Sequence, residues 1–275
     1  MRKASSLVVL MLFVGVLAAV SEVFAAGEST RISPVLDRIV GKKELVVGTA
    51  GSMPPLNMTT KNGQIIGIEV DLAKMIAGAM DVKLTLKPMH FNDLLSALER
   101  GEVDMVLSSM TITPGRNLKF AFVGPYFHSG KSILTKKKNV DDLDEIPKMN
   151  NPDKVLTALK GSTSQMFVER VLPKAKLVLA DDYAQAVAMV RDDKAQAMVA
   201  DYPICMVSVY RYPDDGLATL TKPISYEPIG VALQANDPLL VNWLQNFFNY
   251  LEKTGELDLL IQRWLKETSW VSQLP

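Results

Sequence analysis

The sequence predicts an α/β protein in which mostly parallel sheets are covered by helices. Short apolar runs rich in β-branched residues alternate along the chain with segments whose apolar residues recur at helical spacing. A helix, a charged turn and an apolar strand over residues 98–108 have a counterpart of the same pattern over residues 190–200. Because alternating strands and helices form parallel sheets, and 275 residues suffice for about two domains, we expect two α/β lobes.

The first expected elements are a short helix and a buried strand. Ser33 is expected to cap the helix, with Pro34 at its first position and Gly41 just beyond its end. The apolar run at residues 45–49 is typical of a strand buried on both faces. A loop and then a turn at residues 61–64 are expected to follow.

The next four elements are expected to alternate between helix and strand. Asn92 is expected to cap the second helix of this group, and Gly101 to follow its last turn. The expected helices cover residues 69–80 and 92–100, and the expected strands cover residues 83–87 and 103–107.

Two extended runs, at residues 131–135 and 224–234, separate these elements from the rest of the chain. We interpret them as crossings between two lobes, where a few residues absorb the backbone changes of a hinge. The alternative is that both runs are ordinary strands of one lobe. The chain then ends in two helices, which are expected to start at Pro238 and after Gly255.

The N-terminus has the features of a signal peptide. A basic start at Arg2 and Lys3 precedes an apolar core at residues 7–20, and residues 23–25 offer small side chains at the spacing that signal peptidase requires. The apolar core is too short for a stable transmembrane helix. We therefore expect residues 1–26 to be removed and the mature protein to be periplasmic. Because no cysteine stands near the cleavage site, no lipid anchor is expected.

Composition favours a small molecule as the partner. The 30 basic and 30 acidic residues give a formal net charge of +0, so nothing favours nucleic acid or an anionic membrane surface. Cys205 is the single cysteine, so no intrachain disulfide can form, and it is expected to be buried filler. His90 and His128 lack metal-ligand spacing and no phosphate-binding loop is present, so no metal or cofactor is expected.

A run of hydroxyl side chains that closes on an arginine is the main candidate site. Ser108 to Arg116 follows the strand expected at residues 103–107, and ligands of open α/β sheets bind at the carboxyl ends of strands. The guanidinium of Arg116 suits a carboxylate, which it can grip with two parallel hydrogen bonds. Asp201 follows the equivalent strand of the second unit. The alternative is a polar connecting loop with a solvated arginine.

In their order and spacing, seven segments resemble family 3 of the periplasmic solute-binding proteins, which serve amino-acid ABC transporters. These segments are residues 47–56, 66–73, 94–104, 108–116, 123–127, 160–163 and 255–264. The resemblance covers essentially the whole chain after the signal peptide. It implies a periplasmic-binding-protein fold of two lobes joined by two extended hinge segments. Residues 27–131 and 230–275 would form the first lobe, and residues 132–229 the second.

The resemblance implies a clamp for a zwitterion. Arg116 would bind the α-carboxylate of the ligand, helped by the backbone N–H groups of Thr111 and Thr163 from opposite lobes. The α-ammonium would contact the hydroxyl of Thr111, the carbonyl of Ser109 and the carboxylate of Asp201. Such a set is chemically sensible, because a desolvated zwitterion needs an opposite charge and several hydrogen bonds at each end.

The resemblance also places residues around the side chain of the ligand. Phe91 and Met53 occupy positions where the family often has aromatic residues, and Met53 departs from that pattern. Ala50 stands where relatives that bind basic amino acids have Asp. Leu159 and Ala200 also add no charge, and Ser108 completes the expected ligand-binding set. Together these positions favour an amino acid with a neutral side chain.

The implied activity is capture of a free amino acid by a monomer, followed by closure of the lobes and delivery to the membrane permease of an ABC transporter. No catalytic residue is expected. An alternative is an enzyme, because the chain also resembles the periplasmic cyclohexadienyl dehydratases, which share this fold. The catalytic glutamate of those enzymes would fall at Ile204, which argues against catalysis. A further alternative is a soluble amino-acid sensor.

Overall fold

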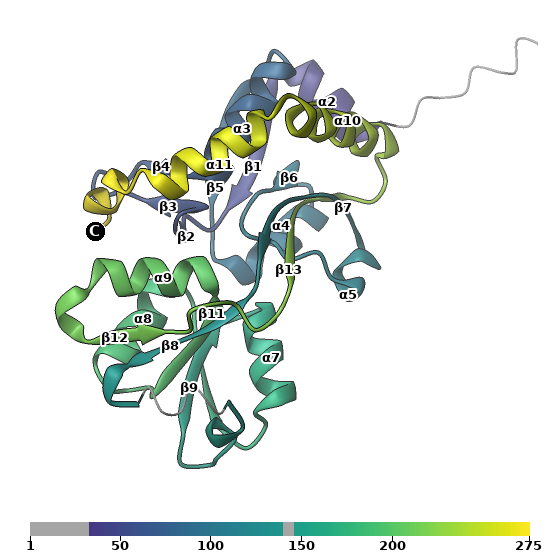
Figure 1. Cartoon of the computed structure of the whole chain (residues 1–275). Helices are drawn as coiled ribbons and strands as arrows, with labels where there is room; N and C mark the ends of the chain where they lie inside the picture. Colours follow the sequence, from purple (N-terminus) through teal and green to yellow (C-terminus); the bar gives the residue numbers. More distant parts are fainter. Residues whose placement is uncertain (1–32, 140–145) are drawn as a thin grey trace, which may run out of the picture. The chain divides into compact units, whose positions relative to one another are not determined.

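The computed structural model describes residues 33–139 and 146–275 (Figure 1). The signal peptide predicted over residues 1–26 lies outside these ranges. In the part of the chain that is described, no helix combines the length and apolar character needed to span a bilayer.

The first lobe is built around a five-stranded sheet in the order β5-β1-β6-β13-β7. Strand β1 is parallel to β5 and β6, whereas β13 is antiparallel to both β6 and β7. Four strands therefore share one direction, as the alternation of strand and helix predicts. The strands are β1 (Glu44–Thr49), β5 (Lys83–Pro88), β6 (Met105–Val106), β7 (Phe120–Ser129) and β13 (Glu227–Gln234).

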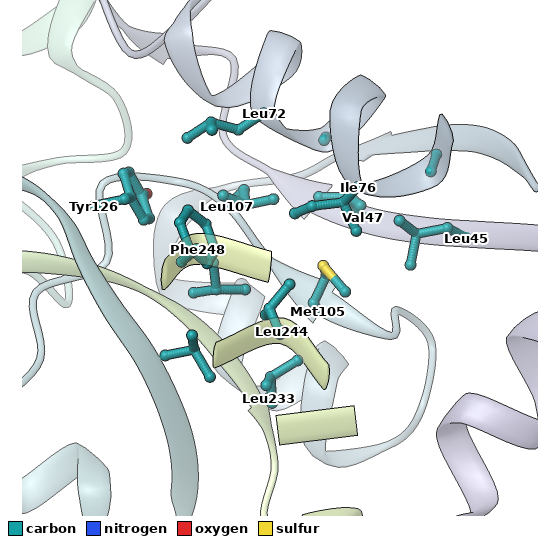
Figure 2. Close-up of a cluster of buried hydrophobic side chains, with 14 of the residues drawn as sticks. Leu45, Val47, Leu72, Ile76, Met105, Leu107, Tyr126, Leu233, Leu244 and Phe248 are labelled. Atoms are coloured by element: carbon teal, nitrogen blue, oxygen red, sulfur yellow. The ribbon is translucent and has the colours of Figure 1, made fainter. Parts of the chain in front are cut away.

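Helices cover this sheet and close a hydrophobic core over it. Figure 2 shows Leu45 and Val47 of β1 beside Ile76 of the second helix, with Leu244 and Phe248 of the long C-terminal helix in the same cluster. Each of these side chains is at most 1% exposed, so truncating one is expected to cost about 2–5 kcal/mol. The helices of this lobe are α2 (Pro34–Lys42), α3 (Ile68–Ala79), η1 (Phe91–Asp93), α4 (Leu94–Glu99), α5 (Pro114–Asn117), α10 (Pro238–Thr254) and α11 (Glu256–Lys266).

The second lobe is built around a five-stranded sheet in the order β10-β9-β11-β8-β12. Strands β10, β9 and β11 are parallel, whereas β8 is antiparallel to β11 and β12. Its strands are β8 (Lys131–Lys136), β9 (Val155–Leu159), β10 (Lys176–Ala180), β11 (Ala197–Asp201) and β12 (Leu217–Thr219). Its helices are α7 (Thr163–Val171), α8 (Tyr183–Arg191) and α9 (Tyr202–Arg211).

The structure adds short elements that the sequence did not predict. A three-stranded sheet, β2 (Ser52–Met53), β3 (Asn57–Thr59) and β4 (Ile65–Ile66), forms where a loop and a turn were expected. Strands of two or three residues are too short to carry a periodic pattern, which is why they were missed. The remaining elements are the 3₁₀ turns η2 (Lys137–Asn139), η3 (Ile146–Met149), η4 (Pro213–Asp215) and η5 (Ser269–Gln273).

Two helix ends differ from the prediction. Helix α2 continues through Gly41, and the left-handed residue that ends it is Lys43. The hydroxyl of Ser33 donates to Asp237 at 2.7 Å, and the carboxylate of Asp237 accepts the N–H groups at the start of α2 instead. Asn92 lies within η1 and does not cap α4, because the chain turns as a 3₁₀ helix first.

The two predicted extended runs belong to different sheets. Strand β8 lies in the second sheet and β13 in the first, so the two runs are not strands of one lobe. The chain passes between the sheets at Gly130 and again just before β13. These passages touch, because the N–H of Ile224 donates to the carbonyl of Lys131, and a Cβ at Gly130 would lie 2.1 Å from the carbonyl of Ser225. Residues 33–275 form one compact unit.

Candidate functional site

Arg116 is positioned by the short helix α5. Thr113 caps this helix, since its hydroxyl accepts the N–H of Arg116 at 3.2 Å. The guanidinium donates through Nη1 to the carbonyl of Thr111 at 2.9 Å, and through Nη2 to the carbonyl of Gly161 at 3.2 Å. The second bond crosses from the first lobe to the second. Arg116 therefore lies at the lobe junction, by which we mean the contact region between the two lobes.

The electrostatic surroundings of Arg116 combine burial with two carboxylates. Burial lowers the pKa of its guanidinium, whereas the negative charges of Glu227 and Asp201 act in the opposite direction. Because a guanidinium keeps its proton in proteins, Arg116 is a fixed positive charge at the junction. Its Cζ also lies 5.8 Å from the ring centroid of Phe91, within reach of a cation–π contact.

Two threonines face each other across the lobe junction. Thr111 follows β6 in the first lobe and bridges to Ile229 of β13. Thr163 is the first residue of α7 in the second lobe, just after the capping residue Ser162. The two threonine hydroxyls are 3.4 Å apart. Thr111 and Thr163, whose N–H groups were expected to help bind the α-carboxylate from opposite lobes, therefore lie beside each other in the structure.

Asp201, at the end of β11, lies in a cluster with two other buried charged residues. Lys131, the first residue of β8, places its Nζ 2.5 Å from Oδ1 of Asp201 and 3.5 Å from Oε2 of Glu227. Lys131 is 2% exposed, Asp201 is 7% exposed and Glu227 is 8% exposed. Oε2 of Glu227 also accepts the hydroxyl of Thr163 at 3.0 Å. We refer to Lys131, Asp201 and Glu227 as the acidic triad.

Ser109 is held by a buried carboxylate. Its φ of 51° lies in the left-handed region, which a serine adopts at some cost, and its N–H donates to Oε1 of Glu69 at 2.6 Å. Glu69 also accepts the hydroxyl of Tyr126 and the amide of Asn57, whose oxygen in turn accepts the N–H of Gly51 at 2.7 Å. Glu69 therefore fixes the loops that follow β1 and β6.

The protonation of this network follows from its burial. Burial raises the pKa of the Glu69 carboxyl, and the hydrogen bonds from Tyr126, Ser109 and Asn57 lower it in part. The pKa of Tyr126 lies well above its ordinary value, because burial and the neighbouring Glu69 both disfavour a phenolate. Within the described part of the chain, the buried hydroxyl of Ser109 has no hydrogen-bond partner.

Apolar residues form one wall beside these polar groups. Met53, Phe91 and Leu159 are buried in one hydrophobic cluster, to which both lobes contribute. The hydroxyl of Ser108 accepts the N–H of Ala50 at 2.8 Å and lies 3.9 Å from the sulfur of Met53. Ala50 and Phe91 also line a cavity of about 360 Å³ between the lobes. The residues that the resemblance placed at the ligand therefore lie in one region of the fold: Ala50, Met53, Phe91, Ser108 and Leu159.

Three buried charged residues of this region were not identified from the sequence. Lys131 begins one of the two extended runs that were interpreted as crossings between lobes, and Glu227 lies in the other. Glu69 lies on the apolar face of a predicted helix. In each case the signal was a charged residue where the pattern requires burial, since such residues are rarely buried without partners. Asp201 was expected to contact the ligand ammonium through its carboxylate, and in the structure this carboxylate is paired with Lys131.

The cysteine and His128 show no sign of a reactive or metal-binding role. Cys205 is buried as predicted, and burial raises the pKa of its thiol to about 12. Among residues 33–139 and 146–275, no cluster of His, Cys, Asp or Glu could hold a metal ion. His128 instead stacks on Tyr226, with ring centroids 5.4 Å apart.

Comparisons with known proteins agree with this architecture. The family model described as bacterial extracellular solute-binding proteins, family 3, matches residues 45–267. The chain is 27% identical over 276 residues to the ABC transporter glutamine-binding protein GlnH of Bacillus subtilis, a match that covers 97% of this chain and 98% of GlnH.

Solved structures give the same result. One is the ancestral amino acid-binding protein AncCDT-1, a precursor of cyclohexadienyl dehydratase, with 34% identity and a TM-score of 0.77 over 83% of this chain and 98% of that one. Another is a mutant of ArgBP from T. maritima, with 31% identity and a TM-score of 0.78 over 85% of this chain and 100% of that one. The two-lobed fold predicted from the sequence is therefore confirmed.

Proposed function

Because the chain belongs to family 3 of the bacterial extracellular solute-binding proteins, we propose that it captures a free amino acid between its lobes and delivers it to an ABC transporter permease. One observation carries the proposal. A half-buried arginine and the acidic triad lie at the same lobe junction, and both threonines lie between them. A cation and an anionic group that share one junction suit the two ends of a zwitterion.

The proposed roles follow from the positions of the polar groups. Arg116 binds the α-carboxylate, together with the N–H groups of Thr111 and Thr163; the second of these lies at the N-terminus of α7, where helix N–H groups favour an anion. The α-ammonium contacts the Thr111 hydroxyl, the Ser109 carbonyl and the Asp201 carboxylate. In this arrangement each end of the ligand meets both opposite charge and hydrogen bonds.

Lobe closure is the proposed consequence of binding. A ligand that contacts both lobes binds better to the closed arrangement and shifts the population toward it. The contacts of Arg116 with Gly161 and of Thr111 with Thr163 already join the lobes. We propose that the lobe that contains β13 moves against the lobe that contains β8, and that the permease binds the closed form.

The charges of the junction favour a ligand with a neutral side chain. Arg116 and Lys131 balance Asp201 and Glu227, which leaves no spare negative charge for a cationic side chain. Met53, Phe91, Ser108 and Leu159 are the proposed surroundings of the side chain, and none of them is charged. The relatives differ in this respect, since GlnH is named for glutamine and the ABC transporter arginine-binding protein 1 of Escherichia coli is named for arginine.

An enzyme on the same fold is the alternative that the sequence left open. AncCDT-1 is described both as an amino acid-binding protein and as a precursor of a dehydratase. In the present chain, the position at which the resemblance placed a catalytic glutamate is Ile204, which is 1% exposed and has no acidic group. We therefore propose binding without catalysis. A soluble sensor would use the same site and differ only in its partner.

The proposed location is the periplasm, where a monomer released from its signal peptide would meet the permease. The family description, extracellular solute-binding proteins, agrees with this location. The signal peptide, the absence of a lipid anchor and the monomeric state are predictions from the sequence.

A thermal-shift screen tests the proposed function. The mature protein is heated with each of the common L-amino acids, and with prephenate and arogenate as probes of the enzyme alternative. A ligand that binds only the folded state raises the melting temperature in proportion to the logarithm of its concentration over its Kd. We expect at least one amino acid to raise the melting temperature. A shift with prephenate alone would favour the enzyme.

A further inference from the structure

We infer that Glu227 supplies the negative charge that binds the ligand ammonium, because Lys131 neutralises Asp201. This inference rests on the proposed amino-acid-binding function and assigns a binding residue that neither the sequence analysis nor the resemblance identified. It begins with the contact between Lys131 and Asp201, whose charged atoms are 2.5 Å apart at a site where both residues are less than a tenth exposed.

The formal charges of the acidic triad show why one aspartate is not enough. Lys131 and Asp201 sum to zero, so an ammonium beside this pair alone would be a buried positive charge without a counter-ion. Such a charge is strongly disfavoured in a site shielded from water. Adding Glu227 brings the triad to a charge of −1, which matches one ammonium. Arg116 matches the carboxylate in the same way, so both ends of a zwitterion are neutralised separately.

The geometry places Glu227 beside the two threonines of the lobe junction. Its Oε2 accepts the hydroxyl of Thr163 at 3.0 Å, and that hydroxyl lies 3.4 Å from the hydroxyl of Thr111. Thr111 is also the residue whose carbonyl is bonded to Arg116. A short chain of contacts therefore runs from the cation at one end of the junction to Glu227 at the other.

Lys131 has a positioning role in this arrangement. Two carboxylates that share a buried site repel each other, and one of them takes up a proton unless a cation lies between them. The ammonium group of Lys131 contacts Asp201 at 2.5 Å and Glu227 at 3.5 Å, so a positive charge lies between the two carboxylates and offsets their repulsion. Glu227 comes from the first lobe and Asp201 from the second, so the triad also joins the lobes.

Charge-neutral substitutions test the inference. The common L-amino acids are first screened by thermal shift on the wild-type protein, and the one with the largest shift is the probe for calorimetric titration. Glu227→Gln keeps an oxygen that can accept from Thr163 but removes the charge, so we expect its affinity for the probe to fall by about 100-fold. Glu102→Gln is the matched control, because Glu102 is exposed and pairs only with surface residues; its affinity should be unchanged.

A double variant separates charge from structure. Lys131→Met with Glu227→Gln returns the triad to a charge of −1, now carried by Asp201, so we expect affinity to recover to within about 10-fold of the wild type. Wild-type affinity in Glu227→Gln would overturn the inference alone, as would equal, unrecovered losses in the single and double variants. If Glu227→Gln does not fold, the double variant decides: recovery supports the inference, and no binding overturns it. A wild-type protein that binds no amino acid would overturn the proposed function and the inference together.

Discussion

The buried carboxylates of this protein have two different kinds of partner. Glu69, in the first lobe, is surrounded by neutral donors: a backbone N–H, a phenol and an amide. Asp201 and Glu227, at the lobe junction, share a buried lysine and lie close enough to Arg116 for their charges to act on it. The first group satisfies every oxygen locally, whereas the second retains one negative charge in excess of its lysine.

Glu69 fixes a loop, whereas Asp201 and Glu227 are proposed to bind a ligand. The carboxylate of Glu69 is fully hydrogen-bonded within its own lobe, where it fixes the left-handed backbone of Ser109. It therefore has no oxygen available for a ligand. A carboxylate cluster with an unmatched charge at a junction between lobes is costly unless another cation enters. Substitutions in the junction should therefore act on binding, and substitutions in the Glu69 network should act mainly on stability.

The largest effect is expected from Arg116→Ala. This change removes the positive charge that is proposed to bind the α-carboxylate and leaves the carboxylate buried without a partner. Breaking a buried ion pair in this way costs about 3–5 kcal/mol, which corresponds to a loss of affinity of roughly 100- to 1,000-fold or more. The measurement is calorimetric titration with the amino acid that the screen identifies. A thermal melt serves as the control, and it should show that the variant remains folded.

Asp201→Asn should lower amino-acid affinity by about 100-fold, since the triad then has no net charge for the ammonium. Titration of this variant under the same conditions checks the expectation. Near-unchanged affinity in both Arg116→Ala and Asp201→Asn would contradict the assignment of the site.

Glu69→Gln should act mainly on stability. A glutamine cannot accept at both positions, so either Asn57 or Ser109 would face a donor where it now meets an oxygen. A buried hydrogen-bonding group left without a partner costs about 1–3 kcal/mol. Urea unfolding of this variant measures the loss, with Glu102→Gln as an exposed control that should change stability by less than about 0.5 kcal/mol. Equal effects of the two variants would argue against the role of Glu69.

The smallest effect is a pH dependence that Glu69 contributes. Burial raises the pKa of its carboxyl above the ordinary value of 4.5, so the folded state binds this proton more tightly than the unfolded state. The contribution of Glu69 to the free energy of unfolding is therefore present at low pH and declines as pH rises from about 4.5 through the raised pKa. Urea unfolding of the wild type and of Glu69→Gln across this range should show the difference between them declining. A difference that grows with pH would contradict the sign.

The sequence predicted what long periodic segments encode. The buried strand at residues 45–49 and the helix at residues 69–80 were predicted because a continuous apolar run and a helical period extend over enough residues to be recognised. The strand expected at residues 103–107 is present only as the two-residue strand β6. The three-stranded sheet of β2, β3 and β4 could not be predicted, since its strands are stabilised by pairing between distant residues and are too short to show a period.

The candidate site was predicted in part. Arg116, Thr111 and Thr163 are brought together as expected, because strand ends and a helix N-terminus place them at one junction. Lys131 and Glu227 were missed because each opens an apolar strand, and the reason for burying them exists only after both strands meet beside Asp201. A charged residue in an apolar run therefore indicates a buried polar contact with another segment.

Calorimetric titration of the wild-type protein with three related compounds tests the central claim most directly. The compounds are the amino acid with the largest thermal shift, its carboxamide, which has no carboxylate charge, and its desamino analogue, which has no ammonium. We expect one molecule of the amino acid to bind per chain and each analogue to bind at least about 100-fold more weakly. Equal affinity for either analogue, or no binding of any amino acid to the folded protein, would contradict the account.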